Sequence, residues 1–155
     1  MPDLITHGSV ALLLGFALVG RRRAPLLPLF VAGTLLPDVL ARVPAIVFGE
    51  LHSKLTPLPM GLLYGWDPMH QPFGMALAAS IFSLLLPPTG RARAFLLLLG
   101  GMLLHLALDL LQFHEGAGHM LLFPFSERTW EIGVIGSEDS VLVAIPLALL
   151  AALAA

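Results

Sequence analysis

The stretch AFLLLLGGMLLHLALDLLQF, Ala94–Phe113, decides what kind of fold this chain can adopt. Its length and apolar character suit a helix that crosses a bilayer, which takes ~20 residues. A histidine and an aspartate nevertheless stand within it, in the motif His105-x-x-x-Asp109. A carboxylate inside a membrane costs about 2.5–3.5 kcal/mol on insertion scales and is usually paired or functional. The stretch therefore predicts a membrane helix that carries part of a polar site.

The composition of the whole chain agrees with a membrane protein. Of its 155 residues, 57% are hydrophobic and 12% are charged, which is about half the charge of an average soluble domain. Four further apolar stretches are expected to form helices: Leu4–Gly20, Pro25–Phe48, Pro72–Leu86 and Ser140–Ala155. We therefore predict an all-α fold, a multi-pass transmembrane bundle of about five short helices that forms one domain over residues 1–155.

The second of these stretches is unusual for a membrane helix. It holds three prolines and two charges: Pro28, Pro37, Pro44, Asp38 and Arg42. Proline removes a backbone donor and kinks a helix, and a broken helix at membrane depth is tolerated where it lines a cavity. The pattern predicts a broken second helix that forms the wall of a cavity.

The basic residues of the short connections predict the orientation. Arg21–Arg23 follow the first helix, and Arg91 and Arg93 precede the fourth. Cytoplasmic loops carry an excess of such residues, so we expect both connections in the cytoplasm. In the inner (plasma) membrane of a cell, the N-terminus and the polar site would then be extracytoplasmic and the C-terminus cytoplasmic. All six histidines fall on the outer side of this map.

The motif His105-x-x-x-Asp109 is the sharpest local feature. Positions i and i+4 share one face of a helix, so the imidazole and the carboxylate would lie side by side, and Gln112 would extend the same face. Because the chain has no cysteine, a metal ion could be held only by histidine and carboxylate. A His–Asp hydrogen bond that joins two helices is an equally good interpretation.

The remaining candidate ligands are Asp38, His7 and His70. Asp38 has an alternative role as a salt-bridge partner of Arg42 at i+4, although a ligating carboxylate can also be held by such a partner. His7 and His70 stand at expected helix ends, where a histidine is more often an interfacial residue than a ligand. Asp67 is an additional candidate ligand or orienting group. Three other histidines are expected to be solvated loop residues: His52, His114 and His119.

Taken in order, these motifs resemble those of the YdjM-like inner-membrane proteins, a family regarded as metal-dependent hydrolases. The family pattern has an early histidine, a Pro-Asp pair in the second helix, a histidine before the third, and a His-x-x-x-Asp helix that leads into a glycine-containing loop ending in Pro-Phe. The matching residues are His7, Leu36-Pro37-Asp38, His70, His105, Asp109, Gly116, Gly118 and Phe123-Pro124-Phe125. The resemblance covers most of the chain, to about Ser126.

The resemblance implies a site in which histidines and aspartates hold Zn²⁺, or another divalent metal such as Mn²⁺, and hydrolyse a phosphoester or a related bond. Two departures reduce the ligand set: Val39-Leu40 follows the Pro-Asp pair where the family often has a second aspartate, and Met69-His70-Gln71 lacks a second histidine. The remaining ligands are sufficient for one or two ions: His7, Asp38, His70, His105 and Asp109.

The sequence thus favours a membrane-bound zinc-type hydrolase, in which Asp38 or Asp109 is the general base if it is not a ligand. A site at membrane depth favours a lipid or lipid-linked substrate. A small transporter that uses the His/Asp cluster as a proton or metal-ion path and an inactive family member are the alternatives. The bilayer is the expected partner, the oligomeric state is left open, and a net charge of −2 gives no reason to expect nucleic acid.

Overall fold

The structure, a computed structural model, describes residues 4–19, 26–54, 66–113, 118–136 and 140–154. The described residues form five α-helices, as the sequence predicts: α1 (Leu4–Val19), α2 (Leu27–Lys54), α4 (Pro72–Leu84), α5 (Arg91–Leu110) and α6 (Ser140–Ala154). Short 3-10 helices precede α4 and α5, namely η2 (Asp67–His70) and η3 (Pro88–Gly90). Two-residue strands, β1 (Gln112–Phe113) and β2 (Ile135–Gly136), pair in parallel.

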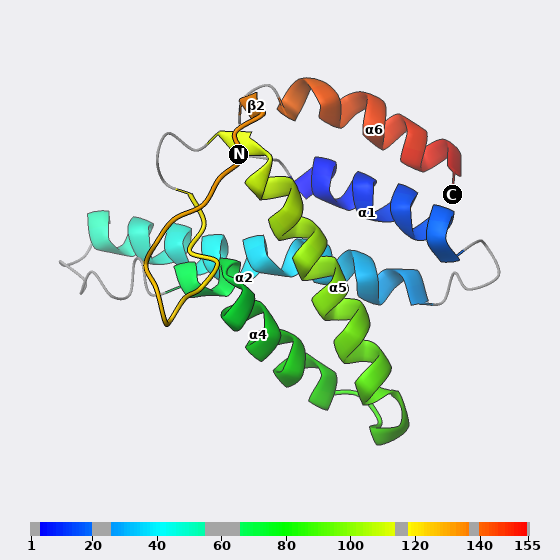
Figure 1. The fold of residues 1–155 in the computed structure, drawn as a ribbon, viewed down its shortest axis with the longest axis horizontal. Coiled ribbons are helices and arrows are strands. Elements are labelled where there is room, and N and C mark those ends of the chain that lie inside the picture. The colour runs from blue at the N-terminus through cyan, green and yellow to red at the C-terminus, as the bar shows by residue number, and fades with distance from the viewer. Residues whose placement is uncertain (1–3, 20–25, 55–65, 114–117, 137–139, 155) are drawn as a thin grey trace.

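Helices α2 and α5 form the centre of the bundle, where α5 crosses α2 (Figure 1). Helix α4 packs on α5, α1 packs on α2, and α6 packs on α1. The buried core lies between α4 and α5 and is closed by leucines of α2. Its fully enclosed members are Met75, Ala78, Ala79, Leu98, Met102 and Leu106.

The outer surface of the helices is apolar. Leu96 on α5 is 66% exposed, and Ile145 on α6 is 68% exposed. Two helical stretches are long and apolar enough to cross a membrane by length and composition, Leu27–Glu50 and Pro88–Leu110, while the remaining apolar helices are shorter. Such a surface is suited to lipid, because lipid covers exposed leucine and isoleucine without the cost that water imposes.

The second helix is continuous, whereas the sequence suggested a break. Pro37 and Pro44 both lie inside α2, which also extends beyond the expected end at Phe48 to Lys54. An internal proline removes one backbone donor but does not force the helix to end where neighbouring groups satisfy the freed carbonyls. No proline stands between Pro44 and Pro57, and the helix continues into this interval.

The fourth helix is shifted relative to the prediction. It begins at Arg91 rather than Ala94 and ends at Leu110 rather than Phe113, because Gln112 and Phe113 leave the helix to pair with β2. The other three helices agree with the sequence to within two residues at the ends that the structure describes.

Two glycines allow α2 and α5 to cross at close range. A Cβ atom added at Gly33 would overlap the carbonyl oxygen of Leu98, and one added at Gly101 would overlap the carbonyl oxygen of Phe30. Membrane helices commonly use small residues in this way to bring two backbones together. The crossing sets the separation between Thr34 on α2 and His105, which lies one turn beyond Gly101 on α5.

Gly101→Ala is therefore expected to lower the free energy of unfolding by about 1–3 kcal/mol, the usual cost of overpacking. Gly100→Ala is the matched control, since its Cβ would lie 3.7 Å from the Phe30 ring, an ordinary contact, and alanine favours a helix by up to ~1 kcal/mol. Unfolding in mixed detergent micelles measures both values. Equal stability of the two variants would contradict the close crossing.

Candidate metal centre

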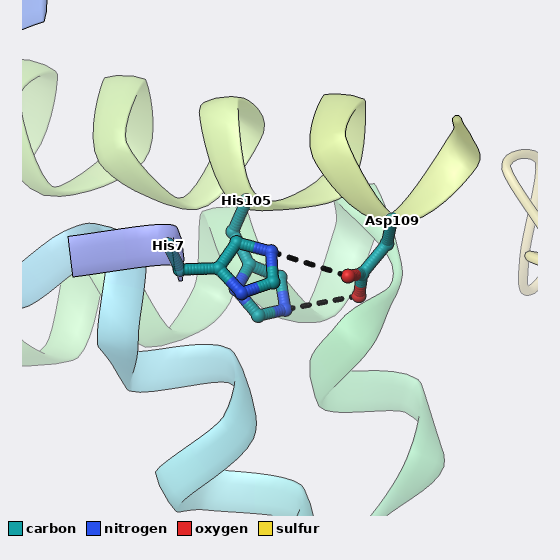
Figure 2. Close-up of side chains that lie close together, drawn as sticks. All are labelled: His7, His105 and Asp109. Carbon is teal, nitrogen blue, oxygen red and sulfur yellow. Dashed lines mark ion pairs between the residues drawn. The ribbon is translucent and has the colours of Figure 1, made fainter. Parts of the chain in front are cut away.

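The His105-x-x-x-Asp109 motif faces the interior of the bundle. His105 is fully buried and Asp109 is 2% exposed. His105 Nε2 lies 3.1 Å from Asp109 Oδ2, as expected for positions i and i+4 on one face of α5 (Figure 2). An orientation toward lipid, which would remove the basis for a site, does not occur.

The first turn of α1 brings His7 to the same point. Its ring stacks on the ring of His105, with centroids 4.1 Å apart and an angle of 23° between the planes. Its Nε2 lies 3.2 Å from Asp109 Oδ1, so that the two carboxylate oxygens of Asp109 face two different imidazoles (Figure 2). His7 is fully buried and is therefore not the interfacial residue that a position near a helix end would suggest.

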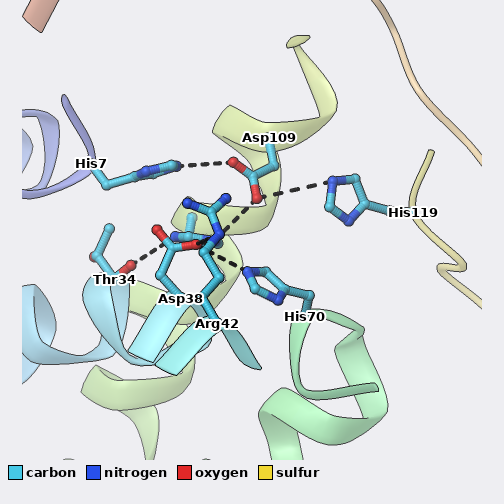
Figure 3. Close-up of polar contacts among 8 residues, drawn as sticks. His7, Thr34, Asp38, Arg42, His70, Asp109 and His119 are labelled. Atoms are coloured by element: carbon cyan, nitrogen blue, oxygen red, sulfur yellow. Dashed lines mark hydrogen bonds and ion pairs between the residues drawn. The ribbon is translucent and has the colours of Figure 1, made fainter. Parts of the chain in front are cut away.

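Asp38 on α2 connects Arg42 and His70 to this cluster. Asp38 Oδ1 lies 3.0 Å from Arg42 Nε, 3.2 Å from His70 Nε2 and 3.9 Å from His105 Nε2 (Figure 3). The salt bridge to Arg42 is thus present, and it coexists with the approach of two histidines. His70 reaches Asp38 from the end of η2, immediately before α4.

A hydrogen bond to the backbone fixes the orientation of the His105 ring. His105 Nδ1 lies 2.9 Å from the carbonyl oxygen of Thr34, three residues before Pro37. A carbonyl oxygen only accepts, so Nδ1 must donate, and in the neutral ring Nε2 then carries the lone pair. This is the arrangement by which metal-binding histidines are usually held. The nitrogen that points at the carboxylates is therefore the one available to a ligand.

Several buried polar atoms of the cluster make no well-aligned hydrogen bond with any described residue, although His7 Nε2 and His105 Nε2 lie 3.2 Å and 3.1 Å from the Asp109 carboxylate. They are both ring nitrogens of His7, Nε2 of His105, Oδ1 of Asp109 and Oδ2 of Asp38. Buried polar groups are rarely left in this state, because each costs about 1–3 kcal/mol. In addition, the carboxylates of Asp38 and Asp109 carry two formal negative charges against one on Arg42. The donor set fits a cation, and the buried His/Asp groups could hold a metal ion.

Two overlapping sets of ligand atoms meet the distances for such an ion. One is His7, His105 and Asp109, and the other is Asp38, His70 and His105; within each set the ligand atoms lie within 4.8 Å of one another. Both sets include His105, whose Nδ1 is occupied by Thr34. The remaining nitrogen of His105, Nε2, can bind only one ion, so the geometry favours a single ion. A second ion would have to be bound without His105.

A cavity of about 420 Å³ opens beside the cluster. It is bordered by α2, α5, the η2–α4 junction and the segment after α5. The residues that line it are Arg42, Asp67, His70, Gln71, Asp109, Gly118, His119, Met120 and Thr129. Asp109 borders this cavity, whereas Asp38 does not and contacts it through its partner Arg42. A small molecule in the cavity would therefore meet Asp109 before it meets Asp38.

The structure corrects the expectation for His119. We expected a solvated loop residue, but His119 is 8% exposed and its Nε2 lies 4.0 Å from Asp109 Oδ2 (Figure 3). The backbone of His119 pairs with that of Trp130 in an antiparallel bridge that turns the segment back toward α5. Only the proximity of glycine and of the Pro-Phe pair in the sequence indicated that this segment belongs to the site. His114 and the side chain of His52 lie outside the described residues.

Two other candidates lie at the edge of the site. Asp67 lines the cavity, but it is exposed and belongs to neither set of ligand atoms. Partial burial raises its pKa above the ordinary value, against the opposing effect of His70. Gln112 does not extend the face of His105 and Asp109, because α5 ends at Leu110, and its side chain borders a separate small cavity with Thr6 and Val143.

Comparison with known proteins identifies the family. The model of the YdjM inner membrane protein family matches residues 1–155. The chain belongs to this family. A search of curated proteins and a search of solved structures each found no match. Membership in YdjM confirms the resemblance seen in the motifs and makes this chain an inner membrane protein, which agrees with its two long apolar helices. Metal ligation by the five candidate residues stays a prediction.

For this YdjM protein, elemental analysis of detergent-purified wild type is expected to find about one divalent ion per chain. Asp109→Asn, which keeps the shape of the side chain but removes its charge, should reduce this content severalfold. Glu127→Gln, at an exposed acid outside the site, should leave the content unchanged. The same metal content in wild type and in Asp109→Asn would mean that the ion is held elsewhere.

Proposed function

We propose that this protein is a membrane-embedded, metal-dependent hydrolase that acts on a phosphoester in a lipid or lipid-linked substrate. The observation that carries the proposal is the position of the cavity, which brings a guanidinium group, histidines and the carboxylate of Asp109 together at one wall. Asp109 belongs to that wall and contacts the buried imidazoles of His7 and His105.

The ligands of the proposed ion are drawn from His7, Asp38, His70, His105 and Asp109. Imidazole and carboxylate suit Zn²⁺, and also Mn²⁺ or iron. The chemistry that such an ion supplies when bound is Lewis-acid activation of water and of a phosphoryl oxygen. Open coordination is typical of catalytic zinc sites, and the cavity provides the space from which water and substrate would approach.

Arg42 supports an anionic substrate. Its Nε is engaged by Asp38, and its side chain, 28% exposed, borders the cavity. A guanidinium group binds phosphate oxygens in a fixed planar geometry, and Asp38 holds this one at the wall. Gln71 and Thr129 border the same cavity and offer further polar contacts.

Asp109 is the better placed of the two aspartates to act as general base, through a carboxylate oxygen that does not hold the ion. Of the two, it alone borders the cavity, so it can accept a proton from a water molecule that attacks a substrate there. Asp38 lies deeper, and its Oδ1 faces Arg42 and His70. Its proposed roles are to bind the ion through Oδ2 and to position Arg42.

The packing below the cluster supports an enzyme over a proton or ion path. On the far side of His105, the buried residues of α5 are Met102, Gly101, Leu98 and Ala94. Of these, Met102 and Leu98 belong to one buried apolar cluster with Met75 and the alanines of α4. A conducting path needs polar or titratable groups in succession, and this part of the bundle offers an apolar core instead.

The proposal is tested with metal-loaded protein in nanodiscs of phosphatidylethanolamine and phosphatidylglycerol, with phosphorus NMR to detect cleaved head groups. Wild type should release a phosphorylated product. Arg42→Gln should lower kcat/KM about 10–100-fold, the loss expected for charged hydrogen bonds of about 1.5–3 kcal/mol, with its metal content unchanged.

Arg128→Gln, at an arginine that does not border the cavity, is the matched control and should retain full turnover. No turnover of phospholipids or of a soluble phosphodiester by loaded wild type, together with pH-dependent ion flux into vesicles, would favour the transport alternative and contradict the proposal.

A further inference from the structure

The segment of residues 118–136, between α5 and α6, exposes more apolar surface than a solvated loop would. It runs across the end of the bundle as the yellow-to-orange trace in Figure 1. Phe125 is 90% exposed, and four further large apolar residues are more than half exposed or nearly so: Leu122 at 57%, Trp130 at 42%, Ile132 at 63% and Val134 at 70%. Exposed apolar groups gathered in this way usually mark a contact surface.

Backbone hydrogen bonds hold this surface at the end of a helix of membrane-spanning length. The amide of Ile132 donates to the carbonyl of Leu110 at 2.7 Å, and the amide of Val134 donates to that of Leu111 at 2.8 Å. Leu110 is the last residue of α5 and of the candidate span Pro88–Leu110. The exposed side chains of Ile132 and Val134 therefore lie beside the end of this candidate span.

The segment has the internal order of a defined structural element. His119 and Trp130 exchange backbone hydrogen bonds of 2.9 Å in both directions. The guanidinium carbon of Arg128 lies 4.5 Å from the centre of the Trp130 ring, a cation–π contact. Tryptophan is enriched where membrane proteins meet the head groups, and arginine at this level can pair with lipid phosphates.

We propose that residues 118–136 lie in the interfacial layer of the bilayer, with Phe125, Ile132 and Val134 in contact with lipid acyl chains. The partner of this surface is the leaflet that holds the end of α5, because two backbone hydrogen bonds fix Ile132 and Val134 beside Leu110 and Leu111. The segment thus follows the membrane surface and does not extend into water.

Other residues of the same segment border the cavity, namely Gly118, His119, Met120 and Thr129. The cavity then lies at head-group level, and its ligand would be an amphiphile whose polar group reaches Arg42 and Asp109 while its chains stay in the bilayer. This consequence rests on the proposed function, whereas the placement of the segment does not.

The placement is tested by site-directed fluorescence, for which the absence of native cysteine is an advantage. Phe125→Cys carries an environment-sensitive nitrobenzoxadiazole label in the full chain, reconstituted in nanodiscs of phosphatidylethanolamine and phosphatidylglycerol. Because Phe125 is 90% exposed, its replacement removes little packing. Glu127→Cys, two residues further along and also exposed, is the matched control.

The label at position 125 should show blue-shifted emission, strong quenching by lipids spin-labelled near the carbonyl end of the acyl chain, and protection from iodide in the water. The label at position 127 should show the reverse. Equal quenching of both labels by iodide would overturn the proposal. Protection of position 125 from both quenchers would overturn it as well, because it would assign the surface to a second copy of the chain or to another protein.

Discussion

The site depends on the hydrogen bond from His105 Nδ1 to the carbonyl oxygen of Thr34. This bond joins the two central helices and uses the one ring nitrogen that would otherwise compete for a ligand. It leaves Nε2 directed at Asp109 and, at longer range, at Asp38. Because the ring of His7 stacks on that of His105, the direction of one imidazole influences the position of the next. The positions of Asp109 and His7 in the candidate centre therefore both depend on the orientation of the His105 ring.

The bond can form because the helices are close together. Gly33 and Gly101 remove the side chains that would separate α2 from α5, and the carbonyl of Thr34 lies in the turn that precedes Pro37. Proline leaves the carbonyl four residues before it, here that of Gly33, without a helical donor and distorts that turn, and Thr34, whose carbonyl accepts from His105, lies in the same turn. The proline in the Pro37-Asp38 pair thus contributes to the site through the backbone, and the aspartate contributes through its carboxylate.

Much of this arrangement was readable from the sequence, because it follows from local periodicity. The length of the apolar stretches predicted five helices, and the i,i+4 spacing predicted that His105 and Asp109 share a face. The same rule predicted the contact between Asp38 and Arg42, which the structure contains together with the approach of His70.

Other features depend on tertiary contacts that have no local signal. The burial of His119 results from its pairing with Trp130 and from the return of the chain to the end of α5. The continuity of α2 through Pro37 and Pro44 has no local signal in the sequence. The role of Arg42 at the cavity wall became visible only when the bordering residues were known. The spacing of residues in the sequence therefore located the polar groups, and the packing of the helices and of the segment after α5 determined which of these groups face one another.

The burial of Asp38 and Asp109 so close together has one consequence for the whole molecule. Two carboxylates in a low-dielectric interior need positive partners, and Arg42 supplies one charge. A second cation in contact with His105 Nε2 would supply a positive partner for the ligand atoms of one of the two sets, His7, His105 and Asp109 or Asp38, His70 and His105. Binding of the ion would then contribute to the free energy of folding, as it does in many small metal-binding domains.

The most direct measurement of this claim is a crystal structure of zinc-loaded protein with anomalous diffraction recorded at the zinc absorption edge. The expected result is an anomalous peak about 2.0–2.2 Å from His105 Nε2 and from an oxygen of Asp109 or Asp38, with Nδ1 still bonded to Thr34. A map without a peak in the cluster, in which His105 Nε2 only donates a hydrogen bond to Asp109, would contradict the account.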